Sequence, residues 1–99
     1  MKSHAMQSQG MIEFLSPAKR VAFSCELADS KIPGHVEATC NFGGMEISIS
    51  APEDAVDRST GSLYVLVIGK THGTYVIDLP GEADNGQRTV SVAKTAFKI

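Results

Sequence analysis

Two cysteines and three histidines are the side chains of this 99-residue chain best suited to covalent or metal chemistry. Cys25 and Cys40 each fall in the apolar phase of an alternating stretch, a position that directs a side chain into a core. We therefore expect two buried, reduced thiols that act as small hydrophobic residues, with a disulfide between neighbouring strands as the alternative. His35 and His72 lie in expected turns, and no close pair such as C-x2-C or H-x3-H indicates a metal site.

Motifs for catalysis do not emerge from the remaining polar residues. Gly43-Gly44 is followed by no helical pattern, whereas a phosphate-binding glycine loop needs a helix N-terminus behind it. Ser59-Thr60-Gly61 lacks the G-x-S-x-G context of a nucleophile elbow. We expect a protein that is not an enzyme and that carries no cofactor or metal ion.

Basic residues offer a place for a small anion rather than for a nucleic-acid polymer. The formal net charge is −2, whereas a general nucleic-acid binder normally carries a basic excess. Lys19 and Arg20 form an adjacent cationic pair, and Arg88, Lys94 and Lys98 form a second, more widely spaced group. Either group is a candidate for holding a small anionic ligand.

The first ten residues are polar and lack the apolar segment of a secretory signal. We expect residues 1–10 to be a disordered leader or an appended extension, and residues 11–99 to form one domain. No apolar run approaches the roughly 20 residues that span a bilayer. The expected location is the cytoplasm, without membrane insertion.

The elements that must position these side chains are strands, and the clearest lie within residues 36–50. Two alternating runs meet there at Gly43-Gly44. A two-residue turn on the glycines gives one register with three apolar pairs: Phe42–Met45, Cys40–Ile47 and Ala38–Ile49. That register gathers the apolar side chains on one side, which is typical of a β-hairpin with a single buried face.

Other stretches predict the remaining strands. A first short strand begins at Ile12 and ends at Ser16-Pro17, because proline cannot donate to a β-ladder. Residues 62–68 are apolar on both faces, which indicates a strand covered on both sides or one that closes a barrel. The other predicted strands are 19–27, 74–79 and 88–99, the last with a bulge near 93–95.

Residues 51–61 are expected to form a loop or a single helical turn between the hairpin and the next strand. The strand number and the spacing of the turns favour closure of the sheet, which protects its edges. The sequence thus predicts an all-β fold: a small antiparallel β-barrel of six to seven short strands.

The order of these features over residues 13–98 resembles the PilZ domain. A basic pair enters a strand, a later strand ends in a polar-glycine turn, and an acidic loop, a long apolar strand and a final hairpin follow. PilZ domains are bacterial barrels of about this length whose usual ligand is cyclic di-GMP. They commonly carry R-x-x-x-R before a strand; here Arg20 stands at the second arginine, Ser16 at the first, and Lys19 supplies a neighbouring cation.

The second PilZ motif, D-x-S-x-x-G, corresponds to residues 39–44. Thr39 stands at the aspartate position, Asn41 at the serine position and Gly44 at the closing glycine. The resemblance implies a ligand-binding site of six residues: Lys19, Arg20, Thr39, Asn41, Gly43 and Gly44. The replacements predict weakened binding, because paired guanidiniums hold phosphate bidentately and stack on guanine, and a threonine lacks the charge of an aspartate.

Three functional hypotheses follow. The first is a non-enzymatic bacterial signalling adaptor of PilZ type that acts through a protein partner, as in pilus or motility machinery, with cyclic di-GMP binding weakened or absent. The second is a working cyclic di-GMP receptor that grips its ligand through Arg20, Lys19 and Asn41. The third is an unrelated small β-barrel that serves as a subunit of a larger assembly.

Overall fold

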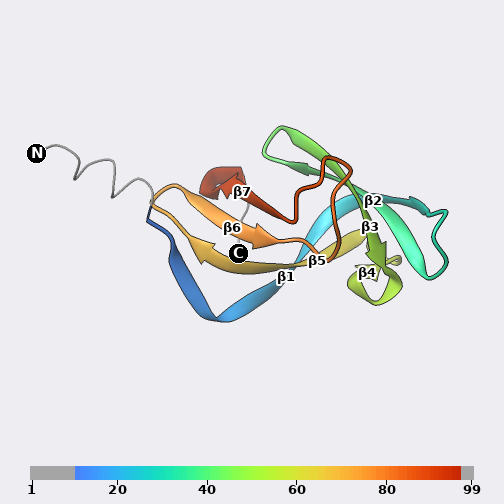
Figure 1. Ribbon diagram of the computed structural model, residues 1–99, viewed down its shortest axis with the longest axis horizontal. Helices are drawn as coiled ribbons and strands as arrows, with labels where there is room; N and C mark the ends of the chain where they lie inside the picture. The colour runs from blue at the N-terminus through green and yellow to red at the C-terminus, as the bar shows by residue number, and fades with distance from the viewer. Residues whose placement is uncertain (1–10, 97–99) are drawn as a thin grey trace, which may run out of the picture.

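The computed structural model describes residues 11–96 and shows an all-β fold (Figure 1). Seven strands form an antiparallel sheet that curls into a half-barrel, in the order β3-β2-β1-β5-β6-β7, with β4 paired to β5. The strands are β1 (Glu13–Asp29), β2 (His35–Phe42), β3 (Met45–Pro52), β4 (Val56–Asp57), β5 (Ser62–Lys70), β6 (Thr74–Asp78) and β7 (Thr89–Ala93). The predicted fold class is confirmed, and the predicted leader, 1–10, lies outside the described residues.

The first strand is longer than predicted. The expected break at Pro17 is wrong, because residues on both sides of the proline belong to one extended strand, β1. The ladder to β5 is interrupted instead: its register shifts between Phe14 and Lys19. Pro17 lies in that interruption, where its missing N–H leaves no ladder bond unmade.

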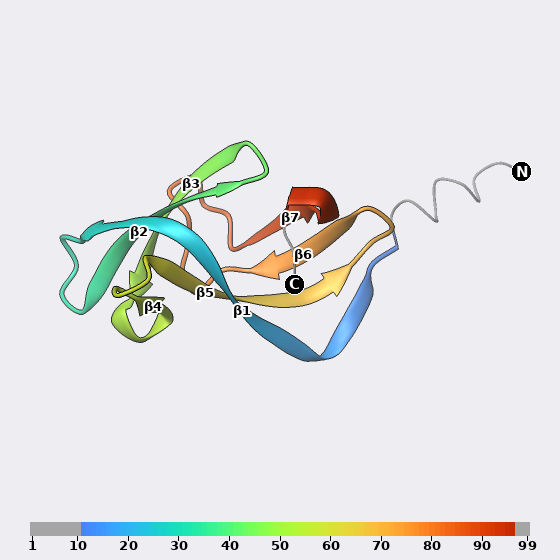
Figure 2. The same cartoon turned by 180° about the vertical axis from the view of Figure 1, so that it is seen from behind.

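The long strand β1 also changes partners along its length. Glu13, Phe14 and residues 19–24 pair with β5, and residues 25–29 pair with β2. Seen from behind, β1 runs from the β5–β6 side of the molecule to the β2–β3 hairpin (Figure 2). One strand therefore joins the two halves of the curled sheet.

The hairpin of β2 and β3 has the predicted register. Phe42 pairs with Met45, Cys40 with Ile47 and Ala38 with Ile49. Gly43 and Gly44 adopt φ values of 65° and 97° in the turn, a region that only glycine enters at no steric cost. Met45 departs from the expected buried face, since it is 38% exposed beside the turn.

The core lies inside the curl and combines side chains of all the longer strands. On β5, Leu63, Val65 and Val67 are buried, but Leu66 on the opposite face is 39% exposed. Of the two expectations for this strand, full coverage on both sides does not hold at Leu66. The strand pairs with a neighbour on each edge within the curled sheet, in line with the alternative of a strand that helps to close a barrel.

Two connecting segments complete the curl. Residues 53–55 form a 3-10 turn, η1 (Glu53–Ala55), in agreement with the single helical turn considered for this region. The segment between β6 and β7 reaches across to β3, where the N–H of Asp84 donates to the carbonyl of Ser48 at 2.8 Å and Ile49 bridges to Ala83. The two ends of the sheet are thereby drawn together.

The predicted last strand is only partly correct. Strand β7 ends at Ala93, and a 3-10 turn, η2 (Lys94–Ala96), follows in place of the predicted bulge. Residues 97–99 of the prediction lie outside the described residues.

Cys25 and Cys40 form a disulfide, so the expectation of reduced thiols is wrong. The two residues are directly opposed in the β1–β2 ladder, with their Cα atoms 4.6 Å apart. The sulfurs meet because both residues lie in the apolar phase of strands that turn out to be neighbours.

Candidate functional site

Only some of the predicted ligand residues on β1 and β2 lie on the same face of the sheet. Arg20 is opposite Leu66, and Thr39 is opposite Glu26, so both side chains lie on the outer face. Asn41 follows two residues after Thr39 and is exposed on the same face. Lys19 is opposite the buried Val67, so consecutive residues Lys19 and Arg20 point to opposite sides of the strand. The adjacent cations therefore do not act as a pair.

Arg20 lies over an aromatic ring on the outer face. Its guanidinium carbon is 4.0 Å from the centroid of the Tyr64 ring, an arrangement that stabilises the cation through the ring's electron-rich face. A groove of about 270 Å³ opens beside this pair, and Asp54, Leu66 and Asp78 contribute to its lining. The groove combines one cation, two carboxylates and apolar surface.

The side chains of the second motif are bound within the hairpin. The hydroxyl of Thr39 is 3.0 Å from that of Ser48 on the neighbouring strand. The side-chain oxygen of Asn41 accepts a hydrogen bond of 2.6 Å from the N–H of Gly44, which fastens the turn. These contacts give Thr39 and Asn41 a structural role that needs no ligand.

A second groove, of about 390 Å³, lies along Thr39 and Asn41. It shares no lining residue with the groove at Arg20. Glu26 and Glu46 line it, so its charge is negative, and phosphate groups of a dinucleotide would be repelled there. The two halves of the predicted site are thus in separate grooves of different character.

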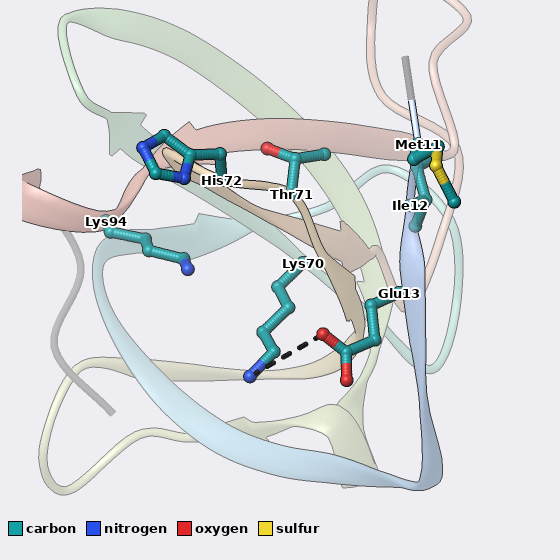
Figure 3. Close-up of a pocket in the computed structure, with 7 residues that line it drawn as sticks. All are labelled: Met11, Ile12, Glu13, Lys70, Thr71, His72 and Lys94. Atoms are coloured by element: carbon teal, nitrogen blue, oxygen red, sulfur yellow. Dashed lines mark ion pairs between the residues drawn. The ribbon is translucent and has the colours of Figure 1, made fainter. Parts of the chain in front are cut away.

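A third groove, of about 610 Å³, was not predicted from the sequence (Figure 3). Met11 and Ile12 stand on one side of it, and His72 and Lys94 on the other. The Nζ atom of Lys70 is 4.0 Å from Oε1 of Glu13, and both residues line this groove. Its residues come from the start of β1, the β5–β6 turn and η2. Their spacing in the sequence does not indicate that they lie together in the folded chain.

The second predicted cationic group does not assemble around this groove. Lys94 lines it and lies with Nζ 5.5 Å from the centroid of the Tyr75 ring, whereas Arg88 does not contribute to the lining. Lys98 lies outside the described residues.

Among the residues that the structure describes, one titratable side chain shows a clear perturbation. The pKa of Asp57 is lowered from its usual value of 3.8, chiefly because the hydroxyl of Ser59 donates to its carboxylate at 2.6 Å. This pair belongs to an exposed turn and stabilises it. Within residues 11–96, no three His, Cys, Asp or Glu side chains lie close enough to hold a metal ion.

Comparisons with known proteins yield no relative: no family model, curated protein or solved structure matches the chain. In the described part of the chain, no helix is long and apolar enough to cross a membrane. The PilZ resemblance rests on the residues quoted above.

Proposed function

We propose that this chain is a non-enzymatic bacterial signalling adaptor of PilZ type that acts through a protein partner, with cyclic di-GMP binding weak or absent. The observation that carries the proposal is Leu66 on the outer face of β5, in the middle of the sheet, where its side chain is 39% exposed beside Arg20 and Tyr64. A partly exposed leucine flanked by these two side chains leaves apolar surface for a partner to bury.

The surroundings of Leu66 are suited to a protein partner. Leu66 lies in register between Arg20 on β1 and Asp78 on β6, and Tyr64 precedes it on the same face. Tyrosine and arginine are the residue types most often responsible for binding energy in protein interfaces. The carboxylates of Asp54 and Asp78 favour a partner segment that brings a lysine or arginine beside an apolar side chain.

The same geometry disfavours cyclic di-GMP. Arg20 and the Thr39–Asn41 pair line different grooves, so they do not form one continuous cradle. The groove at Arg20, at about 270 Å³, is smaller than the roughly 300–1,000 Å³ of typical small-molecule sites. Carboxylates line both grooves, and each would repel a ligand phosphate.

Calorimetric titration with cyclic di-GMP, on the full chain and on Arg20→Ala, tests the ligand part of the proposal. We expect no saturable heat with either protein. Saturable micromolar binding that Arg20→Ala abolishes would instead support the receptor hypothesis.

Affinity capture from a bacterial lysate, with matched variants, tests the partner part. Leu66→Glu places a charge at the centre of the proposed surface, where the side chain is 39% exposed, and Ile32→Glu places one at a 49% exposed apolar residue in the β1–β2 turn. We expect one protein to be retained by the unmodified chain and by Ile32→Glu, and lost with Leu66→Glu. Equal retention by all three proteins contradicts the proposed surface.

The assembly-subunit hypothesis predicts a different result. In that case the purified chain associates with itself, and analytical ultracentrifugation shows an oligomer that Leu66→Glu dissociates. If the unmodified chain and Leu66→Glu are both monomers, the result favours an adaptor whose partner is a different protein.

The proposal includes a cytoplasmic location, and a stable disulfide is unusual in that compartment. Disulfides persist in oxidising compartments, whereas those of ordinary cytoplasmic proteins are mostly transient and redox-sensing. In a cytoplasmic adaptor the Cys25–Cys40 bond would meet cellular reductants.

A further inference from the structure

The Cys25–Cys40 disulfide lies at the position where β1 changes partners. The last registered pair between β1 and β5 is Ser24 with Ser62, and the first between β1 and β2 is Cys25 with Cys40. The N–H of Cys25 still donates to the carbonyl of Gly61 at 2.8 Å. Cys25 is thus held by the β5 side of the molecule through its backbone and by the hairpin through its sulfur.

The attachment of the hairpin to β1 is short. Only the five residues Cys25–Asp29 of β1 are in register with β2. Next to the disulfide, on the same face of the two strands, the rings of Phe23 and Phe42 stack with centroids 4.6 Å apart. The disulfide therefore joins β1 and β2 at the end of their ladder, where the backbone pairing of the two strands stops.

We infer that the Cys25–Cys40 disulfide is a redox latch, which fastens the β2–β3 hairpin to β1 when oxidised and loosens it when reduced. The hairpin also carries Thr39 and Asn41 on its outer face, beside Glu26 of β1. Reduction therefore alters the outer surface along β1 and β2, while the β5–β6 ladder keeps its own register and its buried pair of Val67 and Ile77.

Burial predicts which sulfur reacts. Cys40 is 1% exposed and belongs to the core, whereas Cys25 is partly buried at its margin. Because Cys25 is the less buried of the two residues, we expect an incoming thiolate to attack its Sγ, with Cys40 as the leaving group.

The reaction is thiol–disulfide exchange with a dithiol reductant. A reductant thiolate forms a bond to Sγ of Cys25, the Cys25–Cys40 bond breaks, and Cys40 leaves as a thiolate that takes up a proton. The second thiol of the reductant then attacks the reductant sulfur in the mixed disulfide and releases Cys25 as a thiol. Two electrons pass to the chain, and the reductant becomes a disulfide.

Residue-resolved amide hydrogen exchange on the full chain, oxidised or reduced with dithiothreitol, tests the latch. A disulfide closing a loop of this length predicts roughly 100-fold faster exchange of the amides bonded across the β1–β2 ladder after reduction, because the cross-link restricts the opened state. We expect the amides of β5 and β6 to change much less. Equal acceleration throughout the chain, or no change in the β1–β2 ladder, would overturn the inference.

Two further measurements keep the test independent of any one variant. The double variant Cys25→Ser/Cys40→Ser should exchange like the reduced chain and ignore dithiothreitol; if it does not fold, the reduced unmodified chain supplies the same comparison. Glutathione buffers of graded redox poise, read by thiol alkylation and mass spectrometry, should reduce the bond within the cytoplasmic range. A bond that stays oxidised throughout that range is a permanent staple, and the latch is then wrong.

Discussion

The ring of Phe23 stacks on the ring of Phe42, with centroids 4.6 Å apart and planes inclined by 20°. Phe42 is almost fully buried, and Phe23 packs against the core from β1. The stack lies next to the disulfide and continues the contact between β1 and β2 beyond their last registered pair. We expect this noncovalent apolar contact to help keep the hairpin close to β1 after reduction.

Truncation of Phe42 should therefore be costly. We expect Phe42→Ala to lower the free energy of unfolding by about 3–5 kcal/mol, because a buried aromatic side chain leaves a cavity. Its hairpin partner Met45 is partly exposed, so Met45→Ala should cost about 0.5 kcal/mol or less. Urea unfolding of both variants checks the contrast, and similar losses would show that the ring of Phe42 is not packed as described.

Two glycines should respond to substitution for different reasons. Gly44 has φ of 97°, and a Cβ added there would meet no atom within 4 Å, so Gly44→Ala should cost about 1–2 kcal/mol for its backbone conformation alone. At Gly81, a Cβ would lie 2.7 Å from the carbonyl oxygen of Ser50, so Gly81→Ala should cost about 1–3 kcal/mol through steric overlap.

Asparagine separates these two causes. It tolerates the left-handed region, so Gly44→Asn should recover part of the loss, whereas Gly81→Asn should be at least as harmful as alanine. Thermal or urea unfolding of the four variants provides the comparison. Recovery at Gly81 would contradict the close approach of the β6–β7 segment to β3.

The turn at Asp57 should depend on pH. The folded-state pKa of Asp57 is below 3.8, so the stability it contributes is fully present above that value and is lost as the pH falls from 3.8 through the lower folded-state pKa. NMR titration of the carboxyl carbon measures this pKa directly. In Ser59→Ala the pKa should move back towards 3.8, because the largest lowering contribution is the serine hydroxyl; an unchanged pKa would refute that cause.

The contact between Arg20 and Tyr64 should be measurable as a coupling energy. A double-mutant cycle with Arg20→Ala and Tyr64→Leu should give about 0.5–1 kcal/mol, as expected for a cation over a ring at an exposed site. A coupling near zero would mean that the guanidinium is not engaged by the ring. Arg20 would then be more available to a ligand phosphate than the structure indicates.

The hairpin was predictable in detail because its alternation and its glycine pair act on neighbouring residues. A two-residue turn on Gly43-Gly44 sets the register of residues 36–50, and in that register Cys40 lies opposite Ile47 on the buried face. Strand β1 was harder, since Pro17 prevents a ladder bond without preventing extended backbone. The prediction treated the end of pairing as the end of the strand.

The candidate site depended on relationships between distant strands, and these were not readable from local pattern. The disulfide requires Cys25 to oppose Cys40, which is set by how the chain turns at residues 30–34 and not by either strand alone. The partial exposure of Leu66 depends on which elements pack against the outer face of β5, a tertiary relationship that an apolar run does not specify. Lys19 and Arg20 point in opposite directions because side chains alternate along a strand, and the predicted strand 19–27 already implied this.

The shared strand β1 has a consequence for the order of events during synthesis and folding. The β2–β3 hairpin pairs residues that are close in the chain and can form early, whereas Val21 must wait until Val65 has left the ribosome. Until then the first half of β1 exposes an unpaired ladder edge and apolar side chains. The nascent chain is therefore most prone to aggregate in the interval between completion of the hairpin and arrival of β5.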